Sequence, residues 1–161
     1  MTTVVGPATI RHATRDDCAA IERLLTEAGL PTAGVAEILE DRAQDFFVAE
    51  SSAAPGRVVA VAGLEVCCND ALLRSVAVQS EWRDHGVGRD LVRRVVCHAE
   101  ERGIRAVYLL TMTAEHYFPR FGFEPVERFA VPREIAETLE FKSACPATAV
   151  AMRRAATNAA K

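Results

Sequence analysis

Apolar residues recur along this chain with two spacings, and each spacing predicts one kind of secondary structure. Segments in which they alternate or run together between turn-forming residues predict strands at 8–13, 45–50, 57–67, 71–78, 104–111, 126–131 and 148–152. Segments in which they recur every three or four residues predict helices at 35–42, 86–102, 114–120 and 132–137. A further helix begins at Thr14, with Asp17 at the spacing of a capping box, and is ended by Gly29.

The order of these elements predicts an α/β fold with a mixed sheet of about six to seven strands. The second, third and fourth strands are joined by short turns, which makes them antiparallel. The long helix 86–102 separates the fourth strand from the fifth, which predicts a parallel, right-handed crossover. Strand 57–67 is almost wholly apolar, so we expect helices on both faces of the sheet. The chain 1–161 then forms one domain, with an ordered core at about 7–153 and a tail at 154–161.

The stretch 72–101 carries the strongest local signal. An apolar strand runs into a turn with the spacing Arg83-x-x-Gly86-x-Gly88, and the turn opens the long helix. The first N–H groups of a helix have no partners within the helix, and the helix dipole adds partial positive charge there. Because glycines also let an anion approach the backbone, this turn predicts a site for a phosphate-bearing ligand.

Charge and composition exclude several classes of protein. A net charge of -3 over 161 residues lacks the excess of positive charge that is typical of nucleic-acid-binding proteins. No apolar run is long enough to span a membrane, and the first residues lack the features of a signal peptide, so we expect a cytoplasmic protein without membrane partners. The five cysteines form no CxxC pair, which argues against a disulfide framework and a metal site. Contact of Cys67, Cys68 or Cys145 with a thiophilic ligand stays open.

The glycine turn and a second motif together resemble the GNAT superfamily of N-acetyltransferases. Arg83-x-x-Gly86-x-Gly88 is similar to the acetyl-CoA-binding signature of that superfamily, Q/R-x-x-G-x-G/A. After the fifth strand, a second run resembles the superfamily's A-x-x-F-Y-x-x-x-G-F, and it reads Ala114-x-x-Tyr117-Phe118-x-x-Phe121-Gly122-Phe123. The order of elements agrees along nearly the whole chain. The resemblance implies the GNAT fold, with strands four and five splayed apart, and an acetyl-CoA-dependent N-acetyltransferase.

Two narrower groups of the superfamily share further segments with this chain. Residues 72–78, 108–113 and 141–150 resemble the small acetyltransferases linked to arsenic resistance, and the same segments resemble the acetyltransferase domain of N-acetylglutamate synthases. Both resemblances imply a small primary amine as acceptor, either an amino acid or an amine-bearing arsenical. Dimers are common in the superfamily, so a homodimer is an expectation by analogy.

The resemblance also implies which residues hold acetyl-CoA. The backbone amides of 83–88 would hold its pyrophosphate, and the fourth strand would pair with its pantetheine arm at Val76 and Val78. An amide near Val76 would polarise the thioester carbonyl, which makes Val76 a catalytic candidate. The whole expected cofactor site is Val76, Ala77, Val78, Arg83, Asp84, His85, Gly86, Val87, Gly88, Arg89, Thr111, Ala114 and Phe118.

Acetyl transfer requires a base that takes a proton from the amine, and Glu65 is the candidate. The residue expected to act as the acid departs from the superfamily pattern. Glu65 interrupts an apolar strand on the face shared by Val61 and Gly63, where a partly desolvated carboxylate is suited to take a proton from the amine. The superfamily often has a tyrosine near the leaving thiolate, and Phe118 stands at that position. Tyr117 lies one residue earlier, about 100° around a helix, and should point elsewhere, into packing or the pocket. No general acid is therefore assigned.

The expected acceptor site consists of Arg74, Glu65 and Tyr117. Arg74 shares a face of the fourth strand with Val76 by alternation, and its guanidinium suits the carboxylate of an amino acid. Within the enzyme class, an amino-acid acetyltransferase like the N-acetylglutamate synthases is the alternative. From another class, the missing tyrosine favours a coenzyme-A-binding sensor or accessory protein with weak catalysis.

Overall fold

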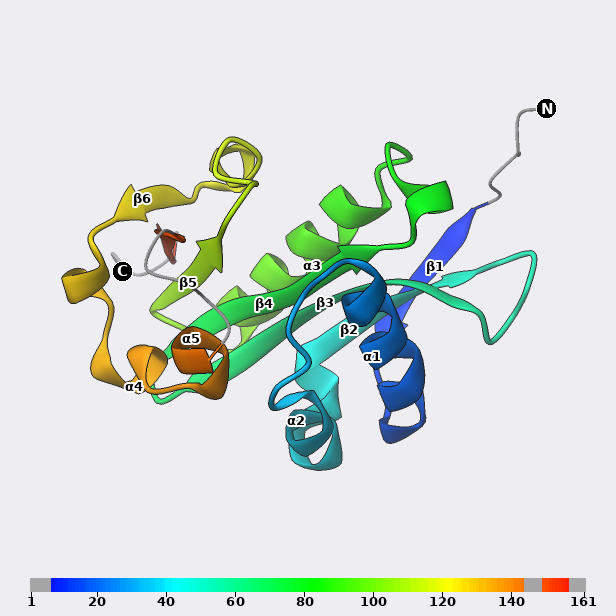
Figure 1. Ribbon diagram of the computed structural model, residues 1–161, viewed down its shortest axis with the longest axis horizontal. Helices are drawn as coiled ribbons and strands as arrows, with labels where there is room; N and C mark the ends of the chain where they lie inside the picture. Colours follow the sequence, from blue (N-terminus) through cyan, green and yellow to red (C-terminus); the bar gives the residue numbers. More distant parts are fainter. Residues whose placement is uncertain (1–6, 144–148, 157–161) are drawn as a thin grey trace.

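The computed structural model describes residues 7–143 and 149–156, and within them seven strands form one sheet (Figure 1). The strands lie in the order β1-β2-β3-β4-β5-β7-β6. Their bounds are β1 Ala8–His12, β2 Phe46–Ser51, β3 Val58–Cys67, β4 Asp70–Val78, β5 Ala106–Thr111, β6 Glu124–Val126 and β7 Val150–Ala155. The α-helices are α1 Cys18–Glu27, α2 Val35–Arg42, α3 Val87–Glu101, α4 Arg133–Ala136 and α5 Leu139–Ser143. The short 3-10 helices are η1 Arg15–Asp17, η2 Ala43–Asp45, η3 Ser80–Trp82, η4 Phe118–Phe121 and η5 Arg128–Ala130.

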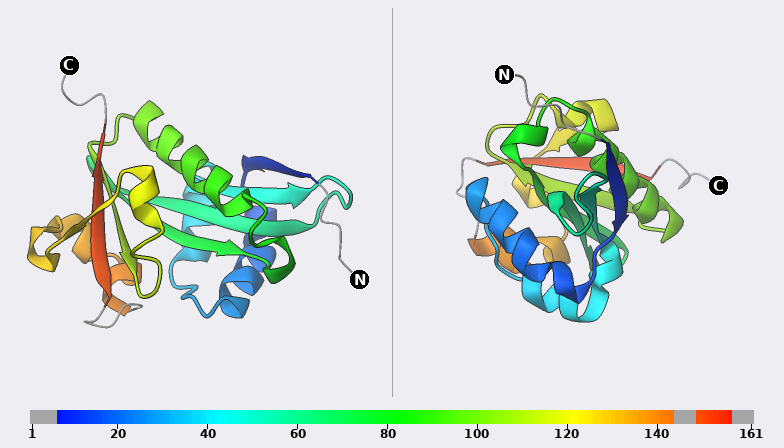
Figure 2. Two further views of the ribbon diagram at one scale, coloured as in Figure 1. Left: turned by 90° about the horizontal axis from the view of Figure 1, so that it is seen from above. Right: turned by 90° about the vertical axis from the view of Figure 1, so that its right-hand side faces the viewer.

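The sheet is mixed, and helices cover both of its faces. β1 to β4 pair antiparallel, β4 pairs parallel with β5, and β7 pairs antiparallel with both β5 and β6. α3 lies on one face of the sheet, and α1 and α2 lie on the other (Figure 2). The predicted mixed sheet and the parallel crossover between the fourth and fifth strands are confirmed.

The apolar stripes of the helices hold them on the sheet. Leu91, Val92 and Val95 of α3 have no exposed surface, and neither have Ile21 and Leu25 of α1. Burial of an aliphatic side chain of this size contributes about 1.5–3 kcal/mol. Packing of these stripes, rather than the intrinsic helix propensity of the segments, therefore fixes both helices.

β4 and β5 pair over only part of their length. Their register ends where Leu72 lies opposite Tyr108, although β4 continues to Val78. Residues 73–78 have no β5 partner in the described part of the chain, and the two strands diverge (Figure 1). The predicted splay is confirmed, and it leaves backbone N–H and C=O groups of β4 without a partner strand on this edge.

A β-bulge interrupts β4 in this unpaired stretch. Gly63 of β3 lies opposite Arg74, and Val61 lies opposite Ala77. Two steps along β3 therefore match three steps along β4. Ser75, inside the longer segment, takes the left-handed conformation with φ 59°. A bulge leaves its extra residue out of the ladder and reverses the alternation of side chains beyond it.

This bulge overturns one prediction made from alternation. Val76 and Val78 pack on the side of α3, and Ala77 packs on the side of α1 and α2. Arg74 also points to the second side, because its Nη2 donates to Ala33 O in the loop between α1 and α2. Arg74 and Val76 therefore lie on opposite faces of the sheet, and the prediction that they share one face was wrong.

The C-terminal part departs from the predicted elements in several places. The strand predicted at 126–131 ends at Val126, because β7 pairs only with the residues before η5. The helix predicted at 114–120 is a turn followed by η4, since Pro119 lacks the N–H that an α-helix needs. β7 lies later than the strand predicted at 148–152, so Ala155 belongs to the sheet and not to a tail. α5 was not predicted, and residues 144–148 lie outside the described part of the chain.

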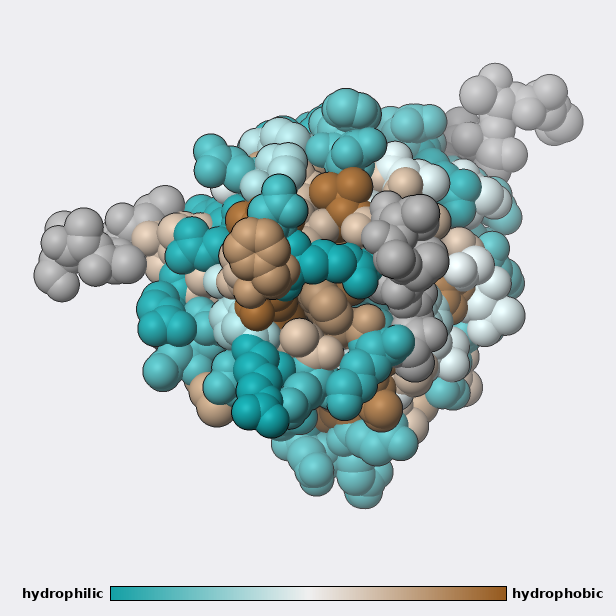
Figure 3. Space-filling model, turned by 60° about the vertical axis from the view of Figure 1, so that its left-hand side comes forward, coloured by the Kyte–Doolittle hydropathy of each residue, from teal (hydrophilic) through white to brown (hydrophobic). Residues whose placement is uncertain are grey.

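Apolar side chains reach the surface near these C-terminal elements. Figure 3 shows a face on which apolar residues gather near the centre and hydrophilic residues surround them. Phe129 of η5 is 88% exposed, and Leu139 of α5 is 57% exposed. Phe129 belongs to the apolar pattern that predicted a strand at 126–131, and its exposure shows that this part of the pattern does not face a core.

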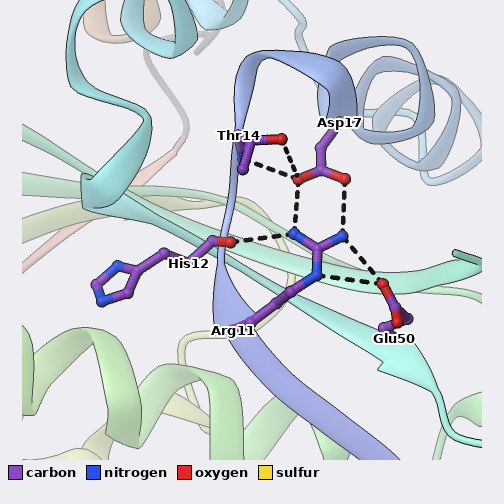
Figure 4. Close-up of polar contacts among 5 residues, drawn as sticks. All are labelled: Arg11, His12, Thr14, Asp17 and Glu50. Carbon is purple, nitrogen blue, oxygen red and sulfur yellow. Dashed lines mark hydrogen bonds and ion pairs between the residues drawn. The ribbon is translucent and has the colours of Figure 1, made fainter. Parts of the chain in front are cut away.

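Arg11 of β1 ties the edge of the sheet to the start of the first helix (Figure 4). Its Nη1 and Nη2 donate to Asp17 Oδ2 (2.8 Å) and Oδ1 (3.0 Å), and its Nε donates to Glu50 Oε1 (3.2 Å). The backbone N–H of Thr14 donates to Asp17 Oδ2 (2.8 Å), which confirms the predicted capping box. Burial of Asp17 opposes its charge, but hydrogen bonds from Arg11 and Thr14 outweigh burial and lower the pKa of this carboxyl.

Asp17→Asn should lower the free energy of unfolding at pH 7 by about 1–3 kcal/mol, because Arg11 loses an ionised partner. A carboxyl with a lowered pKa stabilises the fold above its unfolded pKa, about 3.9, and loses that effect as pH falls below it. Urea unfolding should therefore show a smaller difference between variant and wild type at pH 3 than at pH 7. Asp16→Asn, at an exposed neighbouring position, is the control. An equal difference at both pH values would contradict the assignment.

Candidate active site

A cavity of about 570 Å³ opens where β4 and β5 separate. Its walls come from the loop between α1 and α2, from β4, from the end of β5 and the segment that follows it, and from α5. This volume is typical of a small-molecule site. Of the residues expected from the sequence, the cavity is lined by Arg74, Val76, Ala77, Val78, Arg83, Thr111, Ala114, Tyr117 and Phe118.

The turn before α3 has the backbone that its glycines predict. Asp84 and Gly86 take left-handed φ angles of 65° and 80°, and α3 begins at Val87. Glycine adopts this conformation without strain, whereas other residues seldom do. The first N–H groups of α3 have no partners within the helix, so the turn presents donors and partial positive charge.

Gly88 lies against one end of the cavity. A Cβ at this position would lie 3.2 Å from Val78 Cγ2 and 3.8 Å from Tyr117 Oη, and both residues line the cavity. A Cβ at Gly86 would lie 2.7 Å from Arg89 Nη2. The bare backbone is thus a cradle that a side chain would fill, with a guanidinium beside it. These residues fit the pyrophosphate of coenzyme A.

The rest of the turn lies beside the cavity rather than in its wall. His85 and Val87 line a separate hollow of about 260 Å³, together with the buried Trp82. Arg83 connects the turn to the main cavity, because it lines that cavity and its Nε donates to Val78 O (3.2 Å). The structure therefore brings the predicted turn to the cavity through Arg83 and Gly88.

Arg74 lies at the other end of the cavity, with 1% of its side chain exposed. Nη1 donates to Glu65 Oε1 (2.8 Å), Nε donates to Ser75 Oγ (3.1 Å), and Nη2 donates to Ala33 O. Nη2 also lies 3.3 Å from Glu140 Oε2. The guanidinium is therefore already surrounded by acceptors.

Glu65 meets Arg74, as the predicted acceptor site requires. Its side chain is 17% exposed, and it does not line the cavity. Its carboxylate forms an ion pair with the guanidinium of Arg74. The catalytic role of Glu65 stays a prediction, because the structure shows its partner and not its chemistry.

Glu140 is a site residue that the sequence analysis missed. It belongs to α5, lines the cavity, and has 13% of its side chain exposed. Burial, opposed by Arg74 and reinforced by Glu65, raises the pKa of its carboxyl. Its Oε2 is buried and lies near Arg74 without the geometry of a hydrogen bond. The only sequence signal was a glutamate between Leu139 and Phe141, and no predicted element placed it.

Tyr117 and Phe118 both line the cavity, but most of the Phe118 ring is buried against other aromatic rings. Phe118 is 8% exposed and meets the rings of Tyr117 and Phe123 edge to face. Burial, offset in part by nearby arginines such as Arg120, raises the pKa of the Tyr117 phenol. The phenol therefore keeps its proton at neutral pH and can donate a hydrogen bond. Its hydroxyl lies toward Gly88, near the start of α3, and no general acid is assigned.

Thr111 shapes the end of β5. Its Oγ1 accepts a hydrogen bond from Ala114 N (2.9 Å), which turns the chain toward η4. Both residues also line the cavity. Their side chains are short, so their contribution is to the shape of the wall rather than to charge.

Cysteine reactivity, metal binding and membrane spans are the other features that the sequence analysis considered. Burial raises the pKa of the Cys67 thiol to about 11, which makes this cysteine a poor nucleophile. Cys145 lies outside the described residues. Among residues 7–143 and 149–156, no group of three His, Cys, Asp or Glu side chains is placed to hold a metal ion. In the same ranges, every helix is too short or too polar to cross a membrane.

Curated relatives of this chain are acetyltransferases. An uncharacterized N-acetyltransferase of Chlorobaculum tepidum is 32% identical over 137 residues, which cover 78% of this chain and 81% of that protein. An amino-acid acetyltransferase of Mycobacterium tuberculosis is 32% identical over 139 residues, which cover 81% of this chain and 76% of that protein. An amino-acid acetyltransferase of Pseudomonas fluorescens is 31% identical over 131 residues, or 77% of this chain, but this chain spans only 30% of its length.

Solved structures share the fold. The Rv2747 protein of Mycobacterium tuberculosis, in complex with CoA, has a TM-score of 0.76 and 25% identity, and the match covers 91% of this chain and 98% of that one. N-acetylglutamate synthase from Neisseria gonorrhoeae, complexed with coenzyme A and N-acetyl-glutamate, also has a TM-score of 0.76, at 20% identity. That match covers 94% of this chain and 35% of the synthase chain, and it bears on the fold alone.

A family model also matches this chain. The model of the acetyltransferase (GNAT) domain matches residues 42–125, just over half of the chain, from the end of α2 to β6. This range contains the splayed strands, the turn before α3, and α3 itself. The expected GNAT fold is confirmed by the solved structures. Because the family model, relatives of similar length and the fold agree, this chain belongs to the GNAT family of N-acetyltransferases.

Proposed function

We propose that this protein transfers the acetyl group of acetyl-CoA to the primary amine of a small, amino-acid-like acceptor. One observation carries the proposal. A single cavity of about 570 Å³ runs from Arg83, at the turn before α3, along the unpaired edge of β4 to Arg74 and Glu140. A donor held by the turn and an acceptor at the far end would therefore meet at the bulge in β4.

The donor follows from the family, since GNAT acetyltransferases use acetyl-CoA. The N–H groups at the start of α3, with Arg83 and Arg89, are the groups that would hold its pyrophosphate. Backbone groups of β4 at Val76 and Val78 would hold the pantetheine arm, because no strand pairs with them on the β5 side in the described residues. When bound, acetyl-CoA supplies an activated acyl group as a thioester.

The chain itself would supply orientation and electrostatics. Val76 follows the bulge at Ser75 and lines the cavity, where a backbone N–H donor near it would stabilise developing negative charge on a carbonyl oxygen. Buried residues of β4 and the Tyr117–Phe118 segment would exclude water. Glu65, beside Arg74, is proposed to take a proton from the acceptor amine through water, because its side chain does not line the cavity.

The acceptor is proposed at the level of a class. The names of two curated relatives, both amino-acid acetyltransferases, support an amino acid. An amine-bearing arsenical rests only on the resemblance of segments 72–78, 108–113 and 141–150. A cytoplasmic location and a homodimer likewise stay predictions from the sequence.

The proposal is tested by release of free coenzyme A from acetyl-CoA with a panel of amino acids and amine-bearing arsenicals. Thiol release with at least one primary amine, together with the acetylated product by mass spectrometry, is the expected result. Binding of acetyl-CoA without turnover on any amine would favour the sensor instead, for which the phenylalanine at Phe118 is the supporting observation. Failure to bind acetyl-CoA would overturn both.

Gly88→Val should raise the dissociation constant of coenzyme A by about tenfold or more, because its side chain fills the space between α3 and Val78. Titration calorimetry with coenzyme A measures the effect. Cys97→Val is the matched control, since it places the same side chain at an exposed position of α3, far from the turn. Equal affinities for Gly88→Val and wild type, at unchanged melting temperature, would remove Gly88 from the cofactor site.

Glu65→Gln should lower kcat by about a hundredfold and leave the affinity for acetyl-CoA within about twofold, because the carboxylate acts on the amine. Steady-state rates from pH 6 to 10 and calorimetry with acetyl-CoA measure the two effects. Glu124→Gln, at an exposed position of β6, is the control. Wild-type rates for Glu65→Gln across this pH range would rule Glu65 out.

A further inference from the structure

We propose that Glu140 selects the acceptor: it binds the ammonium group of a small amine, and acidic amino acids are poor acceptors for this enzyme. The inference rests on the proposed acetyl transfer and names the acceptor class for that same site. It depends on three side chains from three separate elements, Glu65 of β3, Arg74 of β4 and Glu140 of α5.

These three side chains leave the acceptor end of the cavity negative. Arg74 carries one positive charge and faces two carboxylates, Glu65 at 2.8 Å and Glu140 at 3.3 Å. The exposed fraction of the side chain is 1% for Arg74, 17% for Glu65 and 13% for Glu140. Water therefore screens the surplus negative charge poorly. Arg83, the other cationic residue in the cavity wall, belongs to the opposite end. The surplus charge therefore favours a cationic group on the acceptor.

Arg74 has little capacity left for an acceptor carboxylate. A guanidinium offers five N–H donors in a planar fork. The Nε donor goes to Ser75 Oγ, an Nη1 donor goes to Glu65, and Nη2 faces both Ala33 O and Glu140. The two donors that remain, one on Nη1 and one on Nη2, lie beside Glu65 and Glu140, so the carboxylate of an acceptor would compete with these residues for them. Arg74 is therefore a positioning residue that holds Glu140, and this replaces the role expected from the sequence.

Glu140 is the carboxylate that still needs a donor. Its Oε2 is buried, and no residue within 7–143 or 149–156 donates a hydrogen bond to it in spite of the nearby guanidinium. Buried carboxylate oxygens without donors are unfavourable, and an ammonium group would supply up to three N–H donors. Glu140 lines the cavity, whereas Glu65 does not. Of the two carboxylates beside Arg74, Glu140 is therefore the one placed to meet a ligand.

The backbone that carries Glu140 is anchored. The N–H of Phe141 donates to Thr138 Oγ1 (3.1 Å), and that hydroxyl donates to Ile135 O (2.8 Å). Phe141 and Ile135 are both buried, in one apolar cluster with Leu72 of β4. The position of the Glu140 carboxylate is thus fixed by packing against the same strand that carries Arg74.

The test compares two isosteric pairs of acceptors, L-glutamine with L-glutamate and L-asparagine with L-aspartate. Each pair differs by one negative charge at nearly constant size. Wild type should show a kcat/KM for the amides at least about tenfold above that for the acids. Glu140→Gln should reduce this ratio toward one, mainly through a higher KM for the amides. Glu137→Gln, which removes an exposed carboxylate that is paired with Arg133, should leave the ratio unchanged.

A binding measurement separates this inference from the proposed function. L-glutamine and L-glutamate are titrated by calorimetry into wild type and Glu140→Gln with coenzyme A bound. Weaker binding of L-glutamine to the variant supports the inference even if turnover is slow. If Glu140→Gln does not fold, Glu140→Asp, which keeps the charge, should keep the amide preference. A wild-type preference for the acids, or a lower KM in Glu140→Gln, would overturn the inference but leave acetyl transfer intact. Absence of transfer to every amine would overturn the proposed function.

Discussion

The early end of the parallel pairing between β4 and β5 is the constraint on which the site depends. Beyond Leu72 and Tyr108 the two strands separate, and the cavity occupies the space between them. A full ladder would have used the backbone groups of β4 for sheet formation and left no opening. The turn before α3 comes soon after the unpaired end of β4 in the chain. The proposed phosphate site and the opening between the strands are therefore built by the same segment.

The bulge at Ser75 turns the side chains before it and after it toward opposite faces of the sheet. Before it, Arg74 points toward the loop between α1 and α2, and after it Val76 and Val78 point toward α3. One extra residue is enough to turn a charged side chain away from the apolar face beside α3. The strand thus presents backbone and small apolar side chains to the proposed donor end of the cavity, and charge to the proposed acceptor end.

Donor and acceptor chemistry come from different parts of the chain. The family model covers residues 42–125, which include the splayed strands and the turn before α3. Glu140 lies beyond this range, on a short helix packed against β4. In the proposed function, the part shared with the family therefore holds the donor, while a C-terminal element sets the charge that the acceptor meets.

The sequence by itself determined the elements up to β5, the mixed sheet and the turn before α3, because periodicity and turn chemistry are local. Only the tertiary structure decided the face of Arg74, since an unpaired residue leaves no mark on the apolar pattern. The same is true of β6, whose position depends on where β7 pairs. Glu140 meets Arg74 and Glu65 only through the packing of α5 against the sheet. Such long-range contacts fix the charge of the proposed acceptor site, and no local pattern encodes them.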